Sequence, residues 1–262
     1  MPSDPNAKTR VAIAFLSLFV VFSAGAYLVA GLSKLPENIS ARESRTALQG
    51  ITDPGQIEEA LKKYPSNKIL QTMAMATRAA DETSAAAEKL SNEIAPPAVS
   101  KDINLGAASR TDLEALRRDL KTAQANASAF MPRFSALLKT ERDDVKKYAL
   151  SLQMQDDAVK RLLDNIDKRH AELTAFTSRI VSARADFYRA YENYVAVLAG
   201  EFGTYKVVDG QFIFPFQRTV DRYNVAANAM TAASKQVTEL EQERKNLVKS
   251  GQERWMQFVN GT

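Results

Sequence analysis

The chain has 262 residues, of which 35 are Lys or Arg and 31 are Asp or Glu, and its formal net charge is +4. Because the two signs alternate along the chain, the basic excess forms no stripe of the kind that binds nucleic acid, and we expect no nucleic-acid partner. The sequence contains no cysteine, which excludes disulfides, thiol catalysis, cysteine-ligated metals and an acylated-cysteine anchor. Abundant Ala, Leu, Glu, Lys and Arg predict a mostly α-helical protein.

An apolar segment follows a short N-terminal tail of residues 1–10. The run over residues 11–32, from Val11 to Leu32, contains no charged side chain. About 20 apolar helical residues are enough to span the hydrocarbon core of a bilayer. The pattern therefore predicts a transmembrane signal anchor.

Lys8 and Arg10 flank this segment on its N-terminal side, which favours a cytoplasmic tail. We expect a single-pass protein of a bacterial inner membrane, with the helical domain of residues 33–262 in the periplasm. A cleaved signal peptide is an alternative, because Ala24–Ala26 forms an A-x-A cleavage site behind an apolar run. A buried core helix is a further alternative, although such helices are rarely apolar on every face.

Capping residues, Pro and Gly divide residues 33–262 into predicted elements. In chain order we expect a short helix opened by the capping box Ser40–Glu43 and ended at Gly50, a helix opened by Asp53-Pro54 and ended by Pro65, a helix over 67–94, and a loop over 95–110. The capping box Thr111–Glu114 then opens a long helical stretch that Pro132 should kink or break, giving two helical pieces over about 112–130 and 133–154. A helix over 155–200, a β-hairpin at about 204–214 and a helix from Pro215 to about Val259 follow.

The strongest periodicity lies in residues 155–200. Side chains there repeat at alternating spacings of three and four residues, which predicts a long helix with one packed face. The series is Ile166, His170, Leu173, Thr177, Ile180, Arg184, Phe187, Tyr191, Tyr194 and Leu198. We therefore predict an all-α fold, an elongated helical bundle or coiled-coil hairpin with one small β-hairpin, preceded by a single transmembrane helix. The same pattern is compatible with a homodimer.

The predicted hairpin is centred on Asp209-Gly210, which separates two β-rich runs. Both turn positions require a positive φ, which Asp and Gly tolerate. Aromatic residues gather around it in the sequence, and two interpretations compete: a small core that attaches the hairpin to two helices, or a surface that binds a partner. The candidate partner-binding residues are Tyr205, Phe212, Phe214 and Phe216.

No catalytic constellation is recognisable, and we expect no enzyme activity, no metal site and no cofactor. The chain has a single histidine, His170, which we interpret as a packing residue of the helix face. Two acidic clusters are interspersed with Lys and Arg, which is typical of solvated helix surfaces; they comprise Glu141, Asp143, Asp144, Asp156 and Asp157. Glu239, Glu241 and Glu243 alternate with basic residues and are interpreted as the charged flanks of a coiled coil.

The hairpin region Val207–Pro215, followed by the pair Tyr223-Asn224, resembles the C-terminal part of the uncharacterised helical envelope proteins of the enterobacterial YiaF type. The resemblance implies a helical envelope domain and carries no catalytic residues. Those proteins resemble lipoproteins, which are anchored through an acylated cysteine, and this chain has no cysteine. The resemblance therefore implies a relative that is held to the membrane by a protein segment rather than by a lipid.

The sequence thus favours a membrane-tethered, non-enzymatic scaffold that binds a protein partner in the envelope. One alternative is a periplasmic ligand-sensing helical bundle that acts through a partner. Another is a membrane-shaping coiled coil, with a basic face formed by Lys139, Arg142, Lys146, Lys147, Lys160, Arg161, Lys168 and Arg169.

Overall fold

A computed structural model describes residues 46–47, 56–94 and 103–260, with the backbone alone for residue 252 and residues 254–260. The apolar segment from Val11 to Leu32, the Ser40 capping box, Gly50 and Asp53-Pro54 lie outside these ranges. No helix within the described ranges is both long and apolar enough to cross a bilayer.

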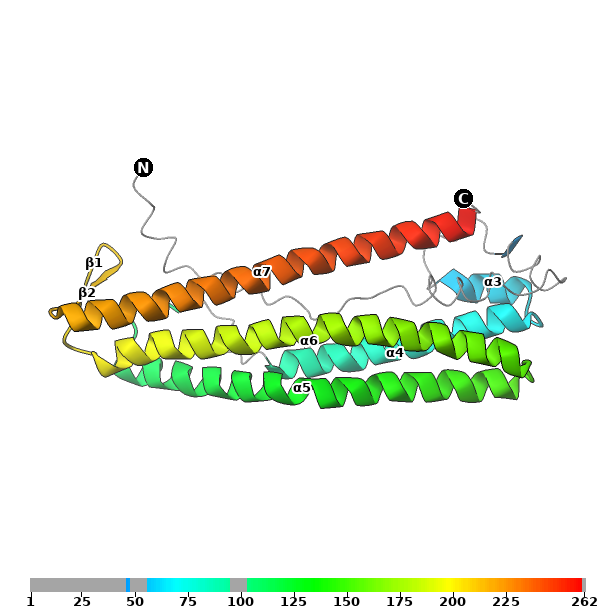
Figure 1. Cartoon of the computed structure of the whole chain (residues 1–262), viewed down its shortest axis with the longest axis horizontal. Helices are drawn as coiled ribbons and strands as arrows, with labels where there is room; N and C mark the ends of the chain where they lie inside the picture. The colour runs from blue at the N-terminus through cyan, green and yellow to red at the C-terminus, as the bar shows by residue number, and fades with distance from the viewer. Residues whose placement is uncertain (1–45, 48–55, 95–102, 261–262) are drawn as a thin grey trace. The chain divides into compact units, whose positions relative to one another are not determined.

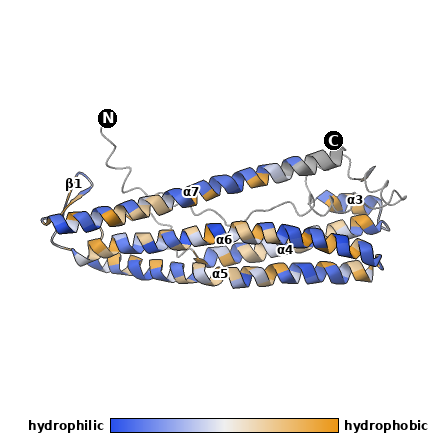
Figure 2. Cartoon of the chain, in the orientation of Figure 1, coloured by the Kyte–Doolittle hydropathy of each residue, from blue (hydrophilic) through white to orange (hydrophobic). Residues whose placement is uncertain are grey.

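The described chain is mostly helical and carries one small β-hairpin, as the sequence predicts (Figure 1). The elements are α3 (Ile57–Lys63), α4 (Lys68–Ile94), α5 (Arg110–Ser151), α6 (Asp156–Gly200), β1 (Lys206–Val208), β2 (Gln211–Ile213) and α7 (Gln217–Asn260). Hydrophilic and hydrophobic residues alternate along each helix (Figure 2), which is the pattern of helices with one packed face.

The chain divides into two compact units. Of the described residues, unit 1 comprises those within Leu90–Met131 and Ser178–Glu241. Unit 2 comprises those within Leu18–Lys89, Pro132–Thr177 and Gln242–Thr262.

In unit 2, α4, α5 and α6 share an apolar core. Small side chains of α4 allow close approach of the larger aliphatic side chains of α6. The core comprises Ala76, Ala79, Ala80, Val145, Ala149, Val159, Leu162, Leu163 and Ile166, with Met75 and Met154 packed against it. Asn67 caps α4, because its Oδ1 accepts hydrogen bonds from the backbone N–H groups of Ile69 and Leu70, at 3.0 and 3.2 Å.

In unit 1, α5, α6 and the first half of α7 provide the buried residues around the hairpin. The predicted face of α6 is confirmed, since its members from Ile180 to Leu198 are buried, and Arg184 among them. On α5 the buried stripe is Leu113, Leu116, Leu120, Ala123, Ala127 and Phe130. This stripe has the same alternation of three and four residues.

The expectation of two helices separated at Pro132 is wrong, because α5 runs through it without a break from Arg110 to Ser151. Proline removes one backbone hydrogen bond and costs a helix interior about 3 kcal/mol. Phe130 and Phe134 are both buried on either side of it, and full burial of each contributes about 1.5–3 kcal/mol. Burial of the flanking aromatic residues is therefore large enough to keep the helix continuous.

The capping box at the start of α5 was predicted two residues too late. Ser109, and not Thr111, is the cap: its Oγ accepts a hydrogen bond from the N–H of Asp112 at 3.2 Å. The Asp112 carboxylate accepts in return from the Ser109 N–H and hydroxyl, at 3.0 and 2.7 Å. This reciprocal pair lowers the pKa of Asp112. Aspartate thus takes the place that glutamate has in the usual box.

At the last helix, α7 begins at Gln217 and not at Pro215. The carbonyl of Phe216 accepts the first helical hydrogen bonds, from the N–H groups of Thr219 and Val220. Pro215 therefore precedes the cap residue, where its fixed φ orients the chain as it leaves β2.

We predict that Ser109→Ala lowers the free energy of unfolding by about 1 kcal/mol, because it removes the cap of α5. Thr111→Ala is the matched control, and it should change stability by less than about 0.5 kcal/mol since this exposed side chain does not cap. Urea denaturation followed by circular dichroism measures both. Equal losses in the two variants would show that Ser109 has no special role.

Candidate functional site

The hairpin of unit 1 is a short two-stranded ribbon beside the start of α7 (Figure 1). The register pairs Lys206 with Ile213 and Val208 with Gln211. Asp209 and Gly210 both have positive φ, 51° and 76°, which confirms the turn predicted from Asp-Gly and matches the twist of the strands. The predicted position of the hairpin is therefore correct.

Alternation along β2 divides its side chains between two faces. Phe212 is 9% exposed and lies opposite Val207. Ile213, the next residue, is 50% exposed. Val207 contacts the loop before α5: a methyl group added to Gly106 would lie 3.2 Å from Val207 Cγ1. The inner face of the hairpin thus packs on the protein, and the other face is open.

Several of the aromatic residues that lie near the hairpin in the sequence contact one another. The Tyr205 ring lies edge-on to Phe212 and Phe214, with centroids 5.2 and 5.6 Å apart. Tyr223 of α7 contacts Phe212 and Phe214, at 5.8 and 5.1 Å, and Tyr194 of α6 at 5.3 Å. Such contacts add to the stabilisation from burial alone. These rings therefore form a small core that fastens the hairpin to α6 and α7.

A hydrogen bond closes this core, since the Tyr194 and Tyr223 hydroxyls are 3.1 Å apart. Burial raises the pKa of Tyr194, and contact with Tyr223 raises it further. The Tyr194 phenol therefore stays protonated across the physiological range. A buried tyrosine needs a polar partner for its hydroxyl, and this pair satisfies both groups.

Exposed apolar side chains concentrate around this core. Six of the seven large hydrophobic residues that are exposed in the described ranges lie within residues 202–225. We call five of them, those on and beside the hairpin, the apolar rim. The apolar rim consists of Phe202, Val207, Val208, Ile213 and Phe216. Gathering of exposed apolar side chains around one short hairpin is typical of interaction sites.

The four candidate partner-binding residues occupy different environments. Phe212 and Phe214 are buried in the aromatic core, and Tyr205 is half-buried beside them. Phe216 is 65% exposed and belongs to the apolar rim. Partner binding by these four stays a prediction. Sequence reasoning overlooked Val208 and Ile213, although their alternation with Phe212 indicates that they face away from it.

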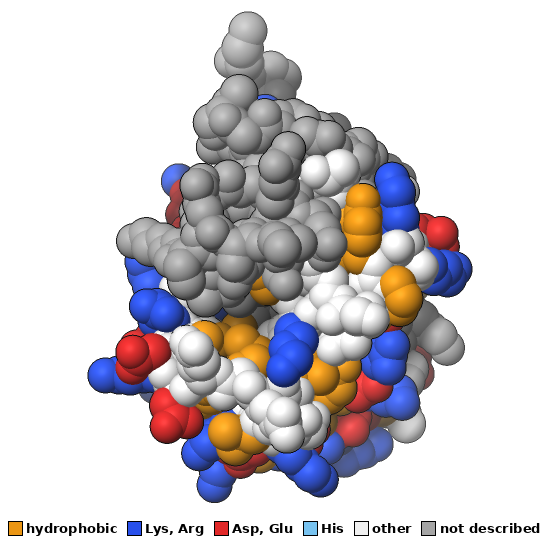
Figure 3. Space-filling model, turned by 90° about the vertical axis from the view of Figure 1, so that its right-hand side faces the viewer, with side chains coloured by type: hydrophobic (Ala, Val, Ile, Leu, Met, Phe, Trp, Pro, Cys, Tyr) orange, Lys and Arg blue, Asp and Glu red, His pale blue; other side chains and the backbone are white. Residues whose placement is uncertain are grey.

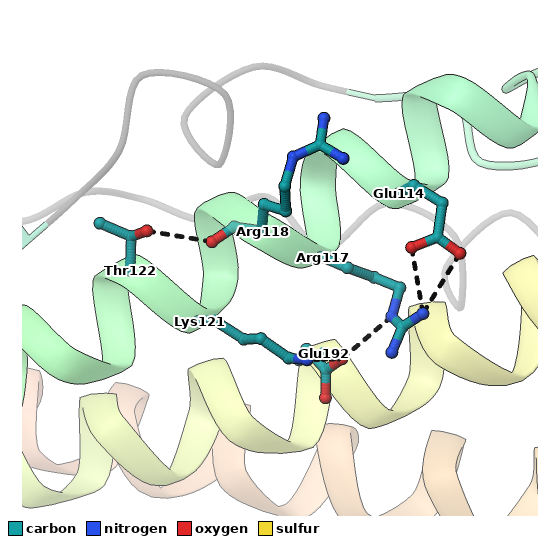
Figure 4. A network of polar contacts seen from close by, with 6 residues as sticks. All are labelled: Glu114, Arg117, Arg118, Lys121, Thr122 and Glu192. Atoms are coloured by element: carbon teal, nitrogen blue, oxygen red, sulfur yellow. Dashed lines mark hydrogen bonds and ion pairs between the residues drawn. The ribbon is translucent and has the colours of Figure 1, made fainter.

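Near the hairpin, a polar network joins α5 to α6 in unit 1 (Figure 4). Arg117 Nε lies 3.0 Å from a carboxylate oxygen of Glu192, and its Nη1 lies 3.1 Å from Glu114. Lys121 Nζ approaches the same Glu192 oxygen at 3.7 Å. The Glu192 side chain is mostly buried, so this carboxylate is screened less than a surface one and stabilises the pairing of α5 with α6.

Two further ionic contacts are buried, one in each unit, and they correct the interpretation of the acidic clusters. In unit 1, Glu241 is buried and lies 3.7 Å from Arg184. In unit 2, Glu141 is 5% exposed and lies 3.5 Å from Arg169 and 3.3 Å from His170 Nε2. The prediction of a solvated carboxylate is wrong for Glu141, and Glu241, predicted on the charged flank of a coiled coil, is buried.

The sequence contains a signal for the burial of Glu141. On α5 it follows Phe134 and Leu138 and precedes Val145 in the series of buried positions, at spacings of three and four residues. A carboxylate at a core position requires cationic or hydrogen-bonding partners. His170 is partly buried and faces this carboxylate, so it is more than a packing residue.

Burial alone would raise the pKa of Glu141, but His170, Arg169 and the Thr83 hydroxyl outweigh burial and lower it. The carboxylate is therefore ionised at neutral pH. Glu141 lies on α5 and its partners lie on α4 and α6, so the cluster ties together the three helices of the unit 2 core.

The basic residues of α5 and α6 do not form one free face. Arg169 is buried, and Arg142 makes a two-fold hydrogen bond with Asp167, at 2.5 and 2.9 Å. On the face of the molecule seen in Figure 3, acidic and basic side chains are mixed, with hydrophobic side chains among them. No group of three or more His, Cys, Asp or Glu within the described ranges is arranged to hold a metal ion.

No family model, no curated protein and no solved structure matches this chain.

We predict that Phe212→Ala destabilises the protein by about 3 kcal/mol, because it empties the centre of the aromatic core. Ile213→Ser, at the neighbouring exposed position, should change stability by less than about 0.5 kcal/mol. Thermal and urea unfolding measure both variants. A loss below about 1 kcal/mol for Phe212→Ala would contradict its assignment to the core.

We predict that Glu141→Gln lowers the free energy of unfolding at pH 7 by about 3 kcal/mol, since it removes the carboxylate that faces the buried Arg169 guanidinium. The lowered pKa of Glu141 means that its stabilisation is complete above the unfolded value of 4.5 and is lost as the pH falls through the folded value. The difference between wild type and variant should therefore shrink below about pH 4.5.

Asp143→Asn is the control for this pH series, because Asp143 is exposed on the same turn of α5. It should stay within about 0.5 kcal/mol of wild type. A Glu141→Gln difference that is the same at pH 3 and pH 7 would contradict an ionic role for Glu141.

Proposed function

We propose that this chain is a membrane-tethered, non-enzymatic scaffold of the bacterial envelope, and that its hairpin region captures a protein partner. The uncharged run from Val11 to Leu32, with Lys8 and Arg10 before it, supports an inner-membrane anchor. The helical domain is then periplasmic.

The observation that carries the proposal is the apolar rim around a rigid aromatic core. Val208, Ile213 and Phe216 are each at least half exposed, and a solvated surface would place polar side chains at such positions. Binding sites commonly combine exposed apolar anchors with a support that holds them in place, since less conformational entropy is then lost on binding. The ring contacts of Phe212 and Phe214 supply that support.

A protein partner fits this chemistry better than a small polar ligand does. The rim is aliphatic and aromatic, and the exposed charged residues Lys206 and Asp209 lie on the same hairpin. An apolar centre with a polar border is the usual composition of a protein interface.

We predict that Ile213→Ser and Phe216→Ser, singly and together, weaken capture of the partner without loss of stability. The full chain, tagged at Thr262, is cross-linked in membranes and purified, and the recovered complex is identified by mass spectrometry. Each exposed apolar anchor typically contributes 1–2 kcal/mol, so the double variant should retain no more than about a tenth of the complex.

Leu150→Ser is the matched control, because Leu150, at 49%, is the one exposed large hydrophobic residue among the described residues of unit 2. It should leave capture unchanged. An equal effect of all three substitutions would contradict the assignment of the site to the hairpin. Intact mass of the recovered chain tests the anchor, since a soluble product that begins at Tyr27 would indicate cleavage.

A further inference from the structure

The outward face of α7 in unit 1 carries a second surface, separate from the apolar rim. Its residues follow a regular spacing of three and four and are all exposed. They are Arg218, Asp221, Val225, Asn228, Ala232, Lys235 and Glu239. We call this series the α7 stripe. The opposite side of the helix is the packed one, where Ala226, Met230 and Leu240 are buried.

The centre of the α7 stripe lacks the charges expected of a solvated helix. Residues 223–234 contain no Asp, Glu, Lys or Arg, although a quarter of the chain is charged. Val225 is 70% exposed, more than any other large hydrophobic residue in the described ranges. An uncharged centre with charged residues on both flanks has the composition of a protein interface, in which a core without charges is surrounded by a polar border.

The charges of the α7 stripe identify the occupant. Arg and Asp come before the uncharged centre, and Lys and Glu follow it, so the stripe is complementary to itself when read in reverse. In an antiparallel pair, Arg218 of one copy lies opposite Glu239 of the other. Asp221 lies opposite Lys235, Val225 opposite Ala232, and Asn228 opposite Asn228. A parallel pair would place each charge opposite the same charge, which is unfavourable.

We propose that the α7 stripe binds a second copy of this chain, through an antiparallel pairing of the two α7 helices about a two-fold axis at Asn228. This is an isologous interface, in which one surface patch serves both subunits. The small side chains of Asn228, Ala229 and Ala232 allow the helix axes to approach to about 8 Å. The two Asn228 side chains hydrogen-bond across the axis and set the register.

The charges at the flanks are available for this pairing. Lys235 and Glu239 are 3.7 Å apart within one helix, and both side chains are well exposed. Asp221 accepts a hydrogen bond from Gln217 at 2.9 Å. Exposed pairs of this kind contribute little, so exchanging them for contacts with a second copy costs little. Arg222 is held by Glu201 and stays outside the stripe.

Cysteine substitutions test the arrangement directly, because the natural chain has no cysteine. Asn228→Cys in the full chain, in detergent micelles with copper phenanthroline as oxidant, should form a disulfide-linked dimer. Val225→Cys alone should not, because its two copies are separated by about 10 Å along the helix axes, beyond the reach of a disulfide. A mixture of Val225→Cys and Ala232→Cys chains should cross-link. Self-linking of Val225→Cys would indicate a parallel pair and overturn the proposal.

Charge exchange provides the second test. Arg218→Glu and Glu239→Arg should each weaken the dimer about 10-fold, measured by sedimentation equilibrium of the full chain in micelles, because each creates two like-charge contacts. The double variant Arg218→Glu/Glu239→Arg should return to within about 2-fold of wild type. Lys160→Glu, at an exposed position of α6, is the control and should have no effect. A monomeric wild-type chain, or a double variant weaker than either single one, would overturn the proposal.

This dimer does not depend on the proposed function, since its residues differ from those of the apolar rim. The double variant Ile213→Ser/Phe216→Ser should dimerise as the wild type does. Arg218→Glu should weaken the dimer, and its monomer should still capture the partner. The two proposals can therefore fail separately.

Discussion

Burial of one continuous face along α6 is the constraint on which the other elements depend. Helices of 42 to 45 residues, such as α5 and α6, gain most of their stability from an apolar face packed on neighbours rather than from intrinsic propensity. In unit 2 the face of α6 meets α4 and α5 through Leu162 and Ile166. In unit 1 it meets α7 through Tyr194. A polar substitution on this face therefore affects several helices at once.

Two buried arginines on α6 interrupt its apolar face, and each lies close to a buried glutamate of a neighbouring helix. Arg169 is matched by Glu141, and Arg184 by Glu241. A buried ion pair contributes little net stability, because desolvation of the charges offsets their attraction. An alternative register, however, would leave a buried charge without its partner and cost several kcal/mol. The pairs thus act mainly to select one alignment among the many that long heptad patterns allow.

The elements with local signals could be predicted from the sequence, and those decided by distant contacts could not. The α6 face, the end of α6 at Gly200 and the Asp209-Gly210 turn each depend on a few neighbouring residues, and all three were predicted correctly. Continuity of α5 through Pro132 depends on the burial of Phe130 and Phe134, which local rules for proline ignore. The spacing of the buried positions on α5 signals that Glu141 is buried, but the cations that pair with Glu141 and Glu241 are distant in the sequence. The exposed rim depends on which hairpin face packs on Gly106.

The hairpin combines exposed apolar side chains with very short open strand edges, and short edges disfavour aggregation by strand pairing. A two-stranded ribbon has two open edges, and long open edges pair with other chains. Here each strand has only three residues, so few backbone groups are available for such pairing. Phe212 and Phe214 hold the ribbon against α6 and α7, so it cannot slip or peel away. The partner that we propose for this site would therefore contact side chains such as Val208 and Ile213 on a fixed backbone, and would not pair as an added strand.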